Sequence, residues 1–146
     1  MAVELKKIPV KGDRYLAQLV LAGDGEHRLN PDSIAEIDKA LDEVENDTSI
    51  SALVTTNEGK FFSNGLDFEF LRANPDKHTH LIVVFQKLLH RFLCFPIPTV
   101  AAICGHAAAG GCMMALAHDY RYMRSDRGFI MLNEVLLLDE VLTTLR

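Results

Sequence analysis

ICGHAAAGGCMMALAHD, from Ile103 to Asp119, is the stretch of this sequence that says most about its fold. An apolar run ends at Gly105, small residues follow as far as Gly110, and a helix-compatible run begins at Gly111. This order predicts a strand, a tight turn and a helix whose first backbone N–H groups have no partner within the helix. Because these N–H groups carry partial positive charge, they favour a bound anion or a developing oxyanion.

A second segment of similar character, GKFFSNGLD from Gly59 to Asp67, lies upstream. Small side chains let a substrate carbonyl approach the backbone itself. Two backbone donors from two separate loops are what an oxyanion hole for a thioester enolate requires. Either loop alone is more often an ordinary strand-to-helix turn, so the hypothesis depends on both loops.

The composition is that of a globular chain with one core. The 146 residues, 49% hydrophobic and 24% charged, fit a single domain over 1–146. The formal net charge of −5 disfavours nucleic acid as a partner, and for Arg121, Arg124 and Arg127 a solvated face is favoured over a phosphate-binding role. No apolar stretch reaches the ~18 residues of a membrane span, and we expect neither membrane insertion nor secretion.

Cysteine and histidine spacing indicates no metal site. Cys94, Cys104 and Cys112 lack CxxC spacing and are interpreted as buried thiols in a reducing compartment. His78 and His80 have no carboxylate or cysteine partner at metal-ligand spacing, so solvent exposure is the favoured interpretation.

Apolar periodicity predicts alternating strands and helices. Asn30 caps a first helix that begins at Pro31, and its apolar stripe is Ile34, Ile37, Leu41 and Val44. The remaining helices are expected at 68–73, 80–95 and 111–117, and the strands at 15–21, 51–56, 99–103 and 119–123. Strand–helix–strand order implies a parallel sheet with crossover helices, and therefore an α/β class.

Four segments carry a family resemblance: GDGEHRLNP, GKFFSNGLD, GHAAAGGC and HDYRYMRSDRGF, in this order. Together they resemble the crotonase (enoyl-CoA hydratase/isomerase) superfamily, most closely the plant-type peroxisomal Δ3,Δ2-enoyl-CoA isomerases. The resemblance implies an α/β crotonase-like (ClpP/crotonase) spiral of β-β-α units, truncated at the C-terminus. It also implies a trimer-like homo-oligomer and a peroxisomal location. The final residues, TTLR, are no peroxisomal tripeptide, which leaves a cytosolic location as the other expectation.

The resemblance also assigns roles to individual residues. The oxyanion hole is implied to use the backbone N–H groups of Leu66 and Gly110. Glu134, alone in an apolar stretch, matches the family's base, and desolvation there suits a general base working near neutral pH. A glutamate that faces solvent at a helix edge is the alternative interpretation.

The CoA half of the substrate is implied to lie against the two loops upstream. The residues expected to bind substrate are Arg28, Leu29, Phe62, Ser63, Asn64 and Gly65, together with Leu66 and Gly110. Arg28 either meets a phosphate or is an ordinary exposed arginine. Because CoA belongs to the substrate, no separate cofactor is expected.

Met113 distinguishes between the activities of the family. In its hydratases a glutamate directly follows Gly-Gly-Cys, and here that position is Met113. One carboxylate with an oxyanion hole fits the shift of a 3-enoyl-CoA double bond to the trans-2 position, a step of fatty acid β-oxidation. Two alternatives stay open: an enoyl-CoA hydratase, and a non-catalytic truncated remnant that binds acyl-CoA or associates with full-length subunits.

Overall fold

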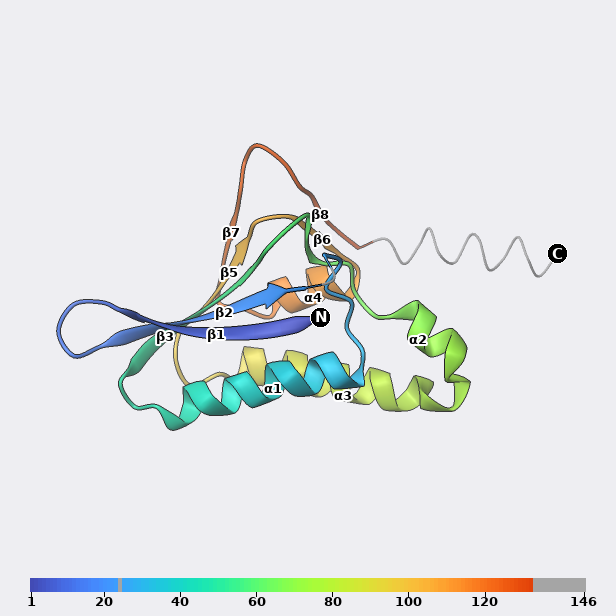
Figure 1. Ribbon diagram of the computed structural model, residues 1–146, viewed down its shortest axis with the longest axis horizontal. Helices are drawn as coiled ribbons and strands as arrows, with labels where there is room; N and C mark the ends of the chain where they lie inside the picture. The colour runs from blue at the N-terminus through green and yellow to red at the C-terminus, as the bar shows by residue number, and fades with distance from the viewer. Residues whose placement is uncertain (24, 133–146) are drawn as a thin grey trace.

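The computed structural model describes residues 1–23 and 25–132, and its larger sheet has five strands (Figure 1). Their order across the sheet is β1-β2-β3-β5-β7, with β1 at Ala2–Pro9, β2 at Tyr15–Ala22, β3 at Ile50–Asn57, β5 at Thr99–Ile103 and β7 at Tyr120–Met123. From β2 to β7 the neighbours pair in parallel, whereas β1 pairs with β2 antiparallel. The predicted parallel sheet is therefore confirmed, with one antiparallel strand added at its edge.

A smaller sheet contains three parallel strands in the order β4-β6-β8. These strands are short: β4 is Phe61–Ser63, β6 is His106–Ala108 and β8 is Ile130–Met131. Since they are parallel, the loops that enter them gather at one end, and the loops that leave them gather at the other.

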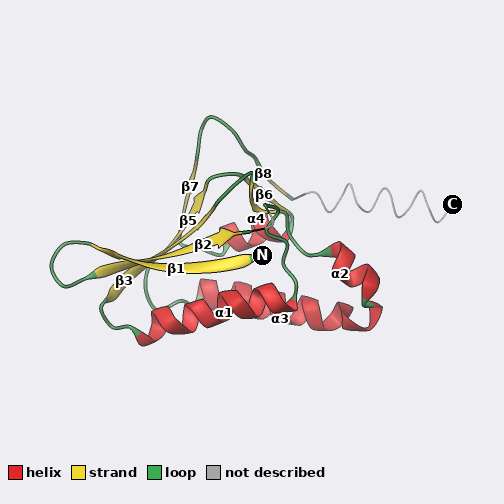
Figure 2. Cartoon of the chain, in the orientation of Figure 1, coloured by secondary structure: helices red, strands yellow, loops and turns green. Residues whose placement is uncertain are grey.

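Helices cover the sheets, and two of them run side by side below the larger sheet in Figures 1 and 2. These two are α1 at Pro31–Asn46 and α3 at His78–Leu93. The others are α2 at Phe68–Ala73, a 3₁₀ turn η1 at Pro75–Lys77, and α4 at Gly110–Leu116. No helix within 1–23 and 25–132 is long and apolar enough to cross a membrane.

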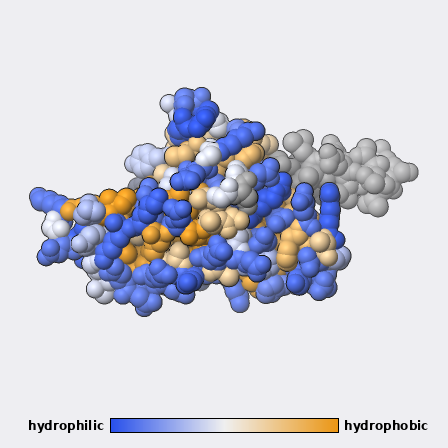
Figure 3. Space-filling model, in the orientation of Figure 1, coloured by the Kyte–Doolittle hydropathy of each residue, from blue (hydrophilic) through white to orange (hydrophobic). Residues whose placement is uncertain are grey.

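The core lies between the two long helices and the larger sheet. Its fully buried members include the predicted stripe of α1 and one face of each central strand: Leu19, Leu21, Ile34, Ile37, Leu41, Leu53, Leu81, Leu88, Phe92 and Ile103. On the face shown in Figure 3, hydrophilic residues cover most of the surface and apolar residues form separate patches. Burial of these aliphatic side chains supplies most of the driving force for folding.

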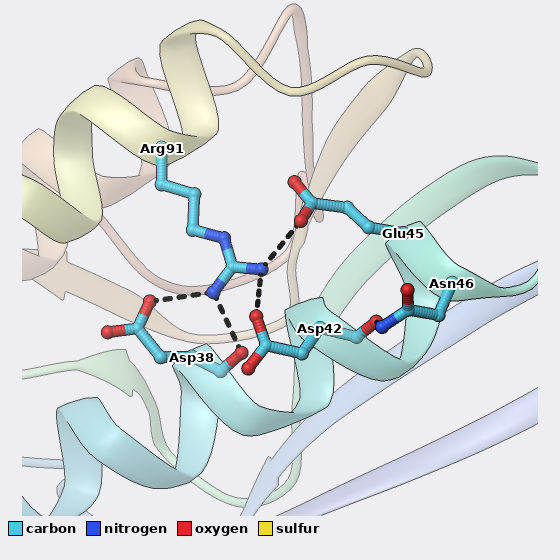
Figure 4. A network of polar contacts seen from close by, with 5 residues as sticks. All are labelled: Asp38, Asp42, Glu45, Asn46 and Arg91. Carbon is cyan, nitrogen blue, oxygen red and sulfur yellow. Dashed lines mark hydrogen bonds and ion pairs between the residues drawn. The ribbon is translucent and has the colours of Figure 1, made fainter.

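Arg91 joins the two long helices through a set of ion pairs (Figure 4). Its guanidinium lies 3.2 Å from the Asp38 carboxylate, 2.6 Å from Asp42 and 2.9 Å from Glu45, all on α1. It also donates to the Asp38 backbone carbonyl at 2.8 Å. Because the Arg91 side chain is mostly buried, these contacts fix the position of α3 against α1 better than an exposed pair would.

Arg91→Ala is expected to lower the free energy of unfolding by about 1–2 kcal/mol, because four charge-assisted contacts are lost together. Urea titration followed by circular dichroism measures the change. Lys87→Ala is the matched control, since Lys87 is exposed on the same helix and makes no ion pair within the described part of the chain. An equal loss in both variants would contradict a specific role for Arg91.

His118 is a buried histidine with both ring nitrogens hydrogen-bonded. Its Nδ1 lies 2.9 Å from the Met114 carbonyl, so Nδ1–H donates there, and Nε2 accepts from the Thr55 hydroxyl at 2.8 Å. Burial lowers the pKa of His118 to about 4, from 6.5. The ring also stacks on Phe92, with the centroids 4.3 Å apart.

We expect the free energy of unfolding to fall as the pH drops from 6.5 towards 4. In this range His118 becomes protonated in the unfolded chain but stays neutral in the folded chain. The contribution is roughly 3 kcal/mol, fully present above pH 6.5. Urea titrations at several pH values measure it, and His118→Gln should remove the slope between pH 6.5 and 5. A slope that survives in this variant would assign it to another group.

Candidate functional site

The Leu66 N–H is directed by a hydrogen bond on the other side of its peptide group. Leu29 and Leu66 form a parallel bridge in which Leu29 N–H donates to the Gly65 carbonyl at 2.8 Å and Asp67 N–H donates to the Leu29 carbonyl at 2.9 Å. In a trans peptide the N–H points opposite to the C=O. The Leu66 N–H therefore points away from Leu29, and it has no acceptor among the described residues.

The Gly110 N–H is directed by the first turn of α4. The Ala109 carbonyl accepts from Met113 N–H at 3.0 Å, so it points along the helix, and the Gly110 N–H on the same peptide points out of the N-terminal end. Within the described part of the chain this N–H also has no acceptor. Ala109 has φ 48°, a conformation that costs a non-glycine residue about 1–3 kcal/mol.

The two loops are in direct contact. A Cβ built on Gly65 would lie 2.9 Å from the Gly110 nitrogen, and a Cβ built on Gly110 would lie 3.5 Å from the Leu66 nitrogen. The backbone of each loop thus occupies the space that a side chain on the other would need. The nitrogen atoms of Leu66 and Gly110 therefore lie close together, and an oxyanion hole formed by their N–H groups stays a prediction.

Both donor residues line one apolar cavity of about 340 Å³ between α2, α3 and α4. The lining residues are Leu66, Phe68, Ile82, Phe85, Gln86, Leu89, Ala109, Gly110 and Met113. Their side chains are hydrocarbon or thioether except for one amide. In such surroundings a hydrogen bond to a charged oxygen is stronger than it is in water.

The Ser63 side chain holds the loop that carries Gly65 and Leu66 in place through two hydrogen bonds. Its hydroxyl donates to the His27 carbonyl at 2.7 Å and accepts from Gly65 N–H at 3.1 Å. Gly111 of α4 packs so tightly against Ser63 that any Cβ on Gly111 would collide with the Ser63 carbonyl. The Ser63 side chain is therefore a structural element under the loop and is fully buried.

Two helix caps hold the residues that flank Leu66. The Asn30 side chain accepts from Ser33 N–H at 3.0 Å and caps α1, and the Asp67 carboxylate accepts from Phe70 N–H at 2.9 Å and caps α2. The Asn30 amide also donates to Asp67 at 3.1 Å. The predicted Asn30 cap is confirmed, and its contact with Asp67 ties the start of both helices to the loop.

The residues expected to bind substrate fall into two groups. Leu29, Phe62 and Ser63 are fully buried, so their side chains are not open to a ligand. Arg28 pairs with the Glu26 carboxylate at 2.6 Å, and the Asn64 amide contacts the same carboxylate at 3.3 Å. The sequence analysis did not predict that the Glu26 carboxylate of the same loop would pair with Arg28.

Two further predicted positions, Met113 and Glu134, complete the comparison. Met113 lines the cavity, so the place that a second glutamate would take is occupied by a thioether. Glu134 lies outside the described residues. His106 lies at the start of β6 and does not line the apolar cavity.

The sequence analysis missed the contribution of α3 to the cavity. Ile82, Gln86 and Leu89 face the cavity, one position along the helix from the buried stripe that includes Leu81, Phe85 and Leu88. Their spacing of four and three residues is itself a helical face. The spacing of Ile82, Gln86 and Leu89 was therefore the sequence pattern from which the contribution of α3 to the cavity could have been predicted. In the residues that the structure describes, no group of three or more His, Cys, Asp or Glu side chains could hold a metal ion.

Residues 26–137 match the family model described as enoyl-CoA hydratase/isomerase. The chain belongs to this family. The crotonase-like fold predicted from the sequence is confirmed by solved structures of the family, for example an enoyl-CoA hydratase from Geobacillus kaustophilus. That structure has a TM-score of 0.80 and 28% sequence identity, and the match covers 92% of this chain and 53% of the other.

Two plant members of the family are more similar in sequence. The peroxisomal enoyl-CoA delta isomerase 1 of Arabidopsis thaliana is 42% identical over 127 residues, which is 86% of this chain and 52% of the relative. Enoyl-CoA delta isomerase 3 of the same plant is 44% identical over 130 residues, which is 86% of this chain and 54% of the relative. The chain spans about half the length of the curated relatives that it matches.

If the N–H groups of Leu66 and Gly110 form the oxyanion hole of an enoyl-CoA enzyme, Gly110→Ala is expected to lower turnover by about 10²-fold, because the new methyl group lies beside both donors and displaces the thioester oxygen. Steady-state kinetics measures the loss. The same methyl group would lie 3.2 Å from the Phe85 ring, so Gly110→Ala/Phe85→Leu is the control that relieves this contact but not the crowding of Leu66. Restored turnover in the double variant would place the defect at Phe85 and not in the hole.

Proposed function

We propose that the protein is a Δ3,Δ2-enoyl-CoA isomerase, which moves the double bond of a 3-enoyl-CoA to the trans-2 position. One observation carries the proposal: two backbone N–H groups without an acceptor among the described residues lie close together at an apolar cavity, and a methionine lines that cavity at the position of a second carboxylate. The names of the Arabidopsis relatives support the same assignment.

The reaction needs one base and one site for negative charge. Glu134 removes a proton from C2 of the substrate, and the electrons move onto the thioester oxygen to give an enolate. The N–H groups of Leu66 and Gly110 donate to this oxygen, and each such donor contributes about 3 kcal/mol to the transition state. The protonated Glu134 then returns the proton to C4, the double bond forms between C2 and C3, and the enzyme regains its initial state.

Hydration needs a second catalytic group in addition to the one base that isomerisation uses. Addition of water across a 2-enoyl-CoA requires one group to activate the water and another to handle the α-proton. Met113 offers no proton acceptor at the second position. We therefore propose isomerisation in preference to hydration, and 2-enoyl-CoA should be hydrated far more slowly than 3-enoyl-CoA is isomerised.

Binding without catalysis is the second candidate, and one observation favours keeping it. Among the described residues, those that line the cavity and carry both donor groups come no later than Met113, so groups other than Glu134 are available to bind a CoA ester. In this case the chain would hold an acyl-CoA and leave it unchanged. The location in peroxisomes and the trimer-like assembly stay predictions from the resemblance.

Glu134→Gln is expected to reduce isomerisation by ~10²–10⁴-fold while the dissociation constant of a saturated acyl-CoA is unchanged, because the amide keeps the shape of the carboxyl group but accepts no proton. Rates are measured by the absorbance of the conjugated 2-enoyl-CoA product, and binding by calorimetry. Glu43→Gln is the control, since Glu43 is an exposed carboxylate on α1 that does not line the apolar cavity.

Three outcomes separate the candidates. Isomerisation by the wild type that survives Glu134→Gln would remove Glu134 from the mechanism. A wild type that binds acyl-CoA but isomerises nothing would replace the proposed activity with binding alone. Hydration of 2-enoyl-CoA as fast as isomerisation would contradict the role given to Met113.

A further inference from the structure

Strand β1 forms one edge of the larger sheet, and no strand within the described residues pairs with the side of β1 that faces away from β2. Val10 N–H donates to the Arg14 carbonyl at 3.0 Å, and this bond continues the register of the β1–β2 ladder. Residues of an antiparallel strand direct their N–H and C=O groups to alternate sides, so the even-numbered residues of β1 bond to β2. The odd-numbered residues Val3, Leu5 and Lys7 therefore direct these groups outward.

The side chains near this open edge leave it accessible to another strand. The Lys7 ammonium is held 2.6 Å from the Asp47 carboxylate and stands over the Tyr15 ring, 4.2 Å from its centroid, so it does not extend across the edge. Pro9 is the next residue on the outward side, and because it has no N–H it ends the row of donors. An edge with unpaired N–H and C=O groups is a template for a further strand.

A groove of about 520 Å³ lies between β1 and α1, beside the open edge. Figure 1 shows β1 lying over α1. Val3 and Leu5 of β1, both half-buried, and Ala40 of α1 line the groove with apolar side chains. The remaining α1 side chains that line it are charged: Glu36, Lys39 and Glu43. A strand added at the edge would direct every second side chain towards this groove.

Glu4 and Lys6 lie on the other face of β1 and make the strand complementary to itself. The Lys6 ammonium lies 3.2 Å from the Glu4 carboxylate, and each side chain is 51% exposed. An antiparallel pairing of two β1 strands about Leu5 places Glu4 of each strand opposite Lys6 of the other. A shift by two residues in either direction places Glu4 opposite Glu4, or Lys6 opposite Lys6, and like charges in these positions are unfavourable. Charge therefore selects the register that is centred on Leu5.

We propose that β1 is an interface at which a second copy of this chain pairs antiparallel about Leu5, so that the two larger sheets become one. Leu5 N–H of each copy donates to the Leu5 carbonyl of the other, and Val3 and Lys7 exchange hydrogen bonds in the same way. Every outward N–H group of the two strands then has an acceptor. The two Leu5 side chains lie next to each other on the side of the groove. None of the residues that line the apolar cavity takes part, so the interface is independent of the proposed reaction.

The test is sedimentation equilibrium of the full chain over a range of concentrations. Glu4→Lys and Lys6→Glu should each raise the dissociation constant of the dimer about tenfold or more, because two like-charge pairs replace two opposite-charge pairs. Both positions are exposed, so neither change should unfold the monomer. The combined variant Glu4→Lys/Lys6→Glu restores opposite charges across the interface and should return the constant to within about threefold of the wild type.

A mixture of the two single variants gives a second test of the register. Glu4→Lys and Lys6→Glu chains carry only opposite charges towards each other, so together they should form a heterodimer although each alone is impaired. Glu58→Lys is the control, since it makes the same change of charge as Glu4→Lys at an exposed position directly after β3. The control should change the dissociation constant by less than about twofold at 0.15 M salt.

Each result supports or overturns the proposal. A wild type that remains monomeric at about 100 µM overturns the second copy as the occupant of the edge and leaves the edge to an extended segment of another protein. An assembly that responds to neither Glu4→Lys nor Glu58→Lys, or equally to both, is formed through another surface and also overturns it. If Glu4→Lys/Lys6→Glu stays as impaired as the single variants, the register about Leu5 is wrong. Loss in both single variants with recovery in the combined variant and in the mixture supports the pairing.

Discussion

The hydrogen bond from Leu29 N–H to the Gly65 carbonyl orients the peptide group on which the rest of the site depends. It ties the loop after β2 to the loop after β4, and it turns the Leu66 N–H towards the opposite side. Gly110 is positioned in the same way, because the first bond of α4 occupies the Ala109 carbonyl and leaves the N–H outside the helix. Each donor is thus aimed by what its own peptide carbonyl binds, and both are fixed before any ligand arrives.

The larger framework keeps those two peptides together. The Asn30–Asp67 contact joins the caps of α1 and α2, and Arg91 joins α1 to α3. Through α1, two of the three helices that surround the apolar cavity, α2 and α3, are therefore held together. Ser63 and Gly111 close the space between the two donor loops. Positive φ at Ala109 adds strain that this packing sustains.

Much of the fold followed from the sequence, because long elements carry strong local signals. Asn30-Pro31 with its apolar stripe predicted α1, and Pro96-Ile97-Pro98 placed the end of α3 within two residues. Strands β4, β6 and β8 were not predicted, since strands of two or three residues have no periodicity to detect. Strand β1 was not predicted either, because its charged and largely exposed residues resemble a solvated segment. Leu66 and Gly110 were assigned through family motifs, whereas the Arg28–Glu26 pair depends on side-chain contacts that the sequence does not order in space.

A site formed by backbone N–H groups has a consequence for how its importance can be detected. Replacement of Leu66 by alanine or valine changes the wall of the apolar cavity but leaves the donor in place, so a scan of side-chain substitutions reports the packing of this side chain and not the donor. Only chemistry that acts on the main chain, such as exchange of the amide for an ester between Gly65 and Leu66, removes the donor itself. The effect of a side-chain substitution at Leu66 therefore carries no information about whether the hole is used.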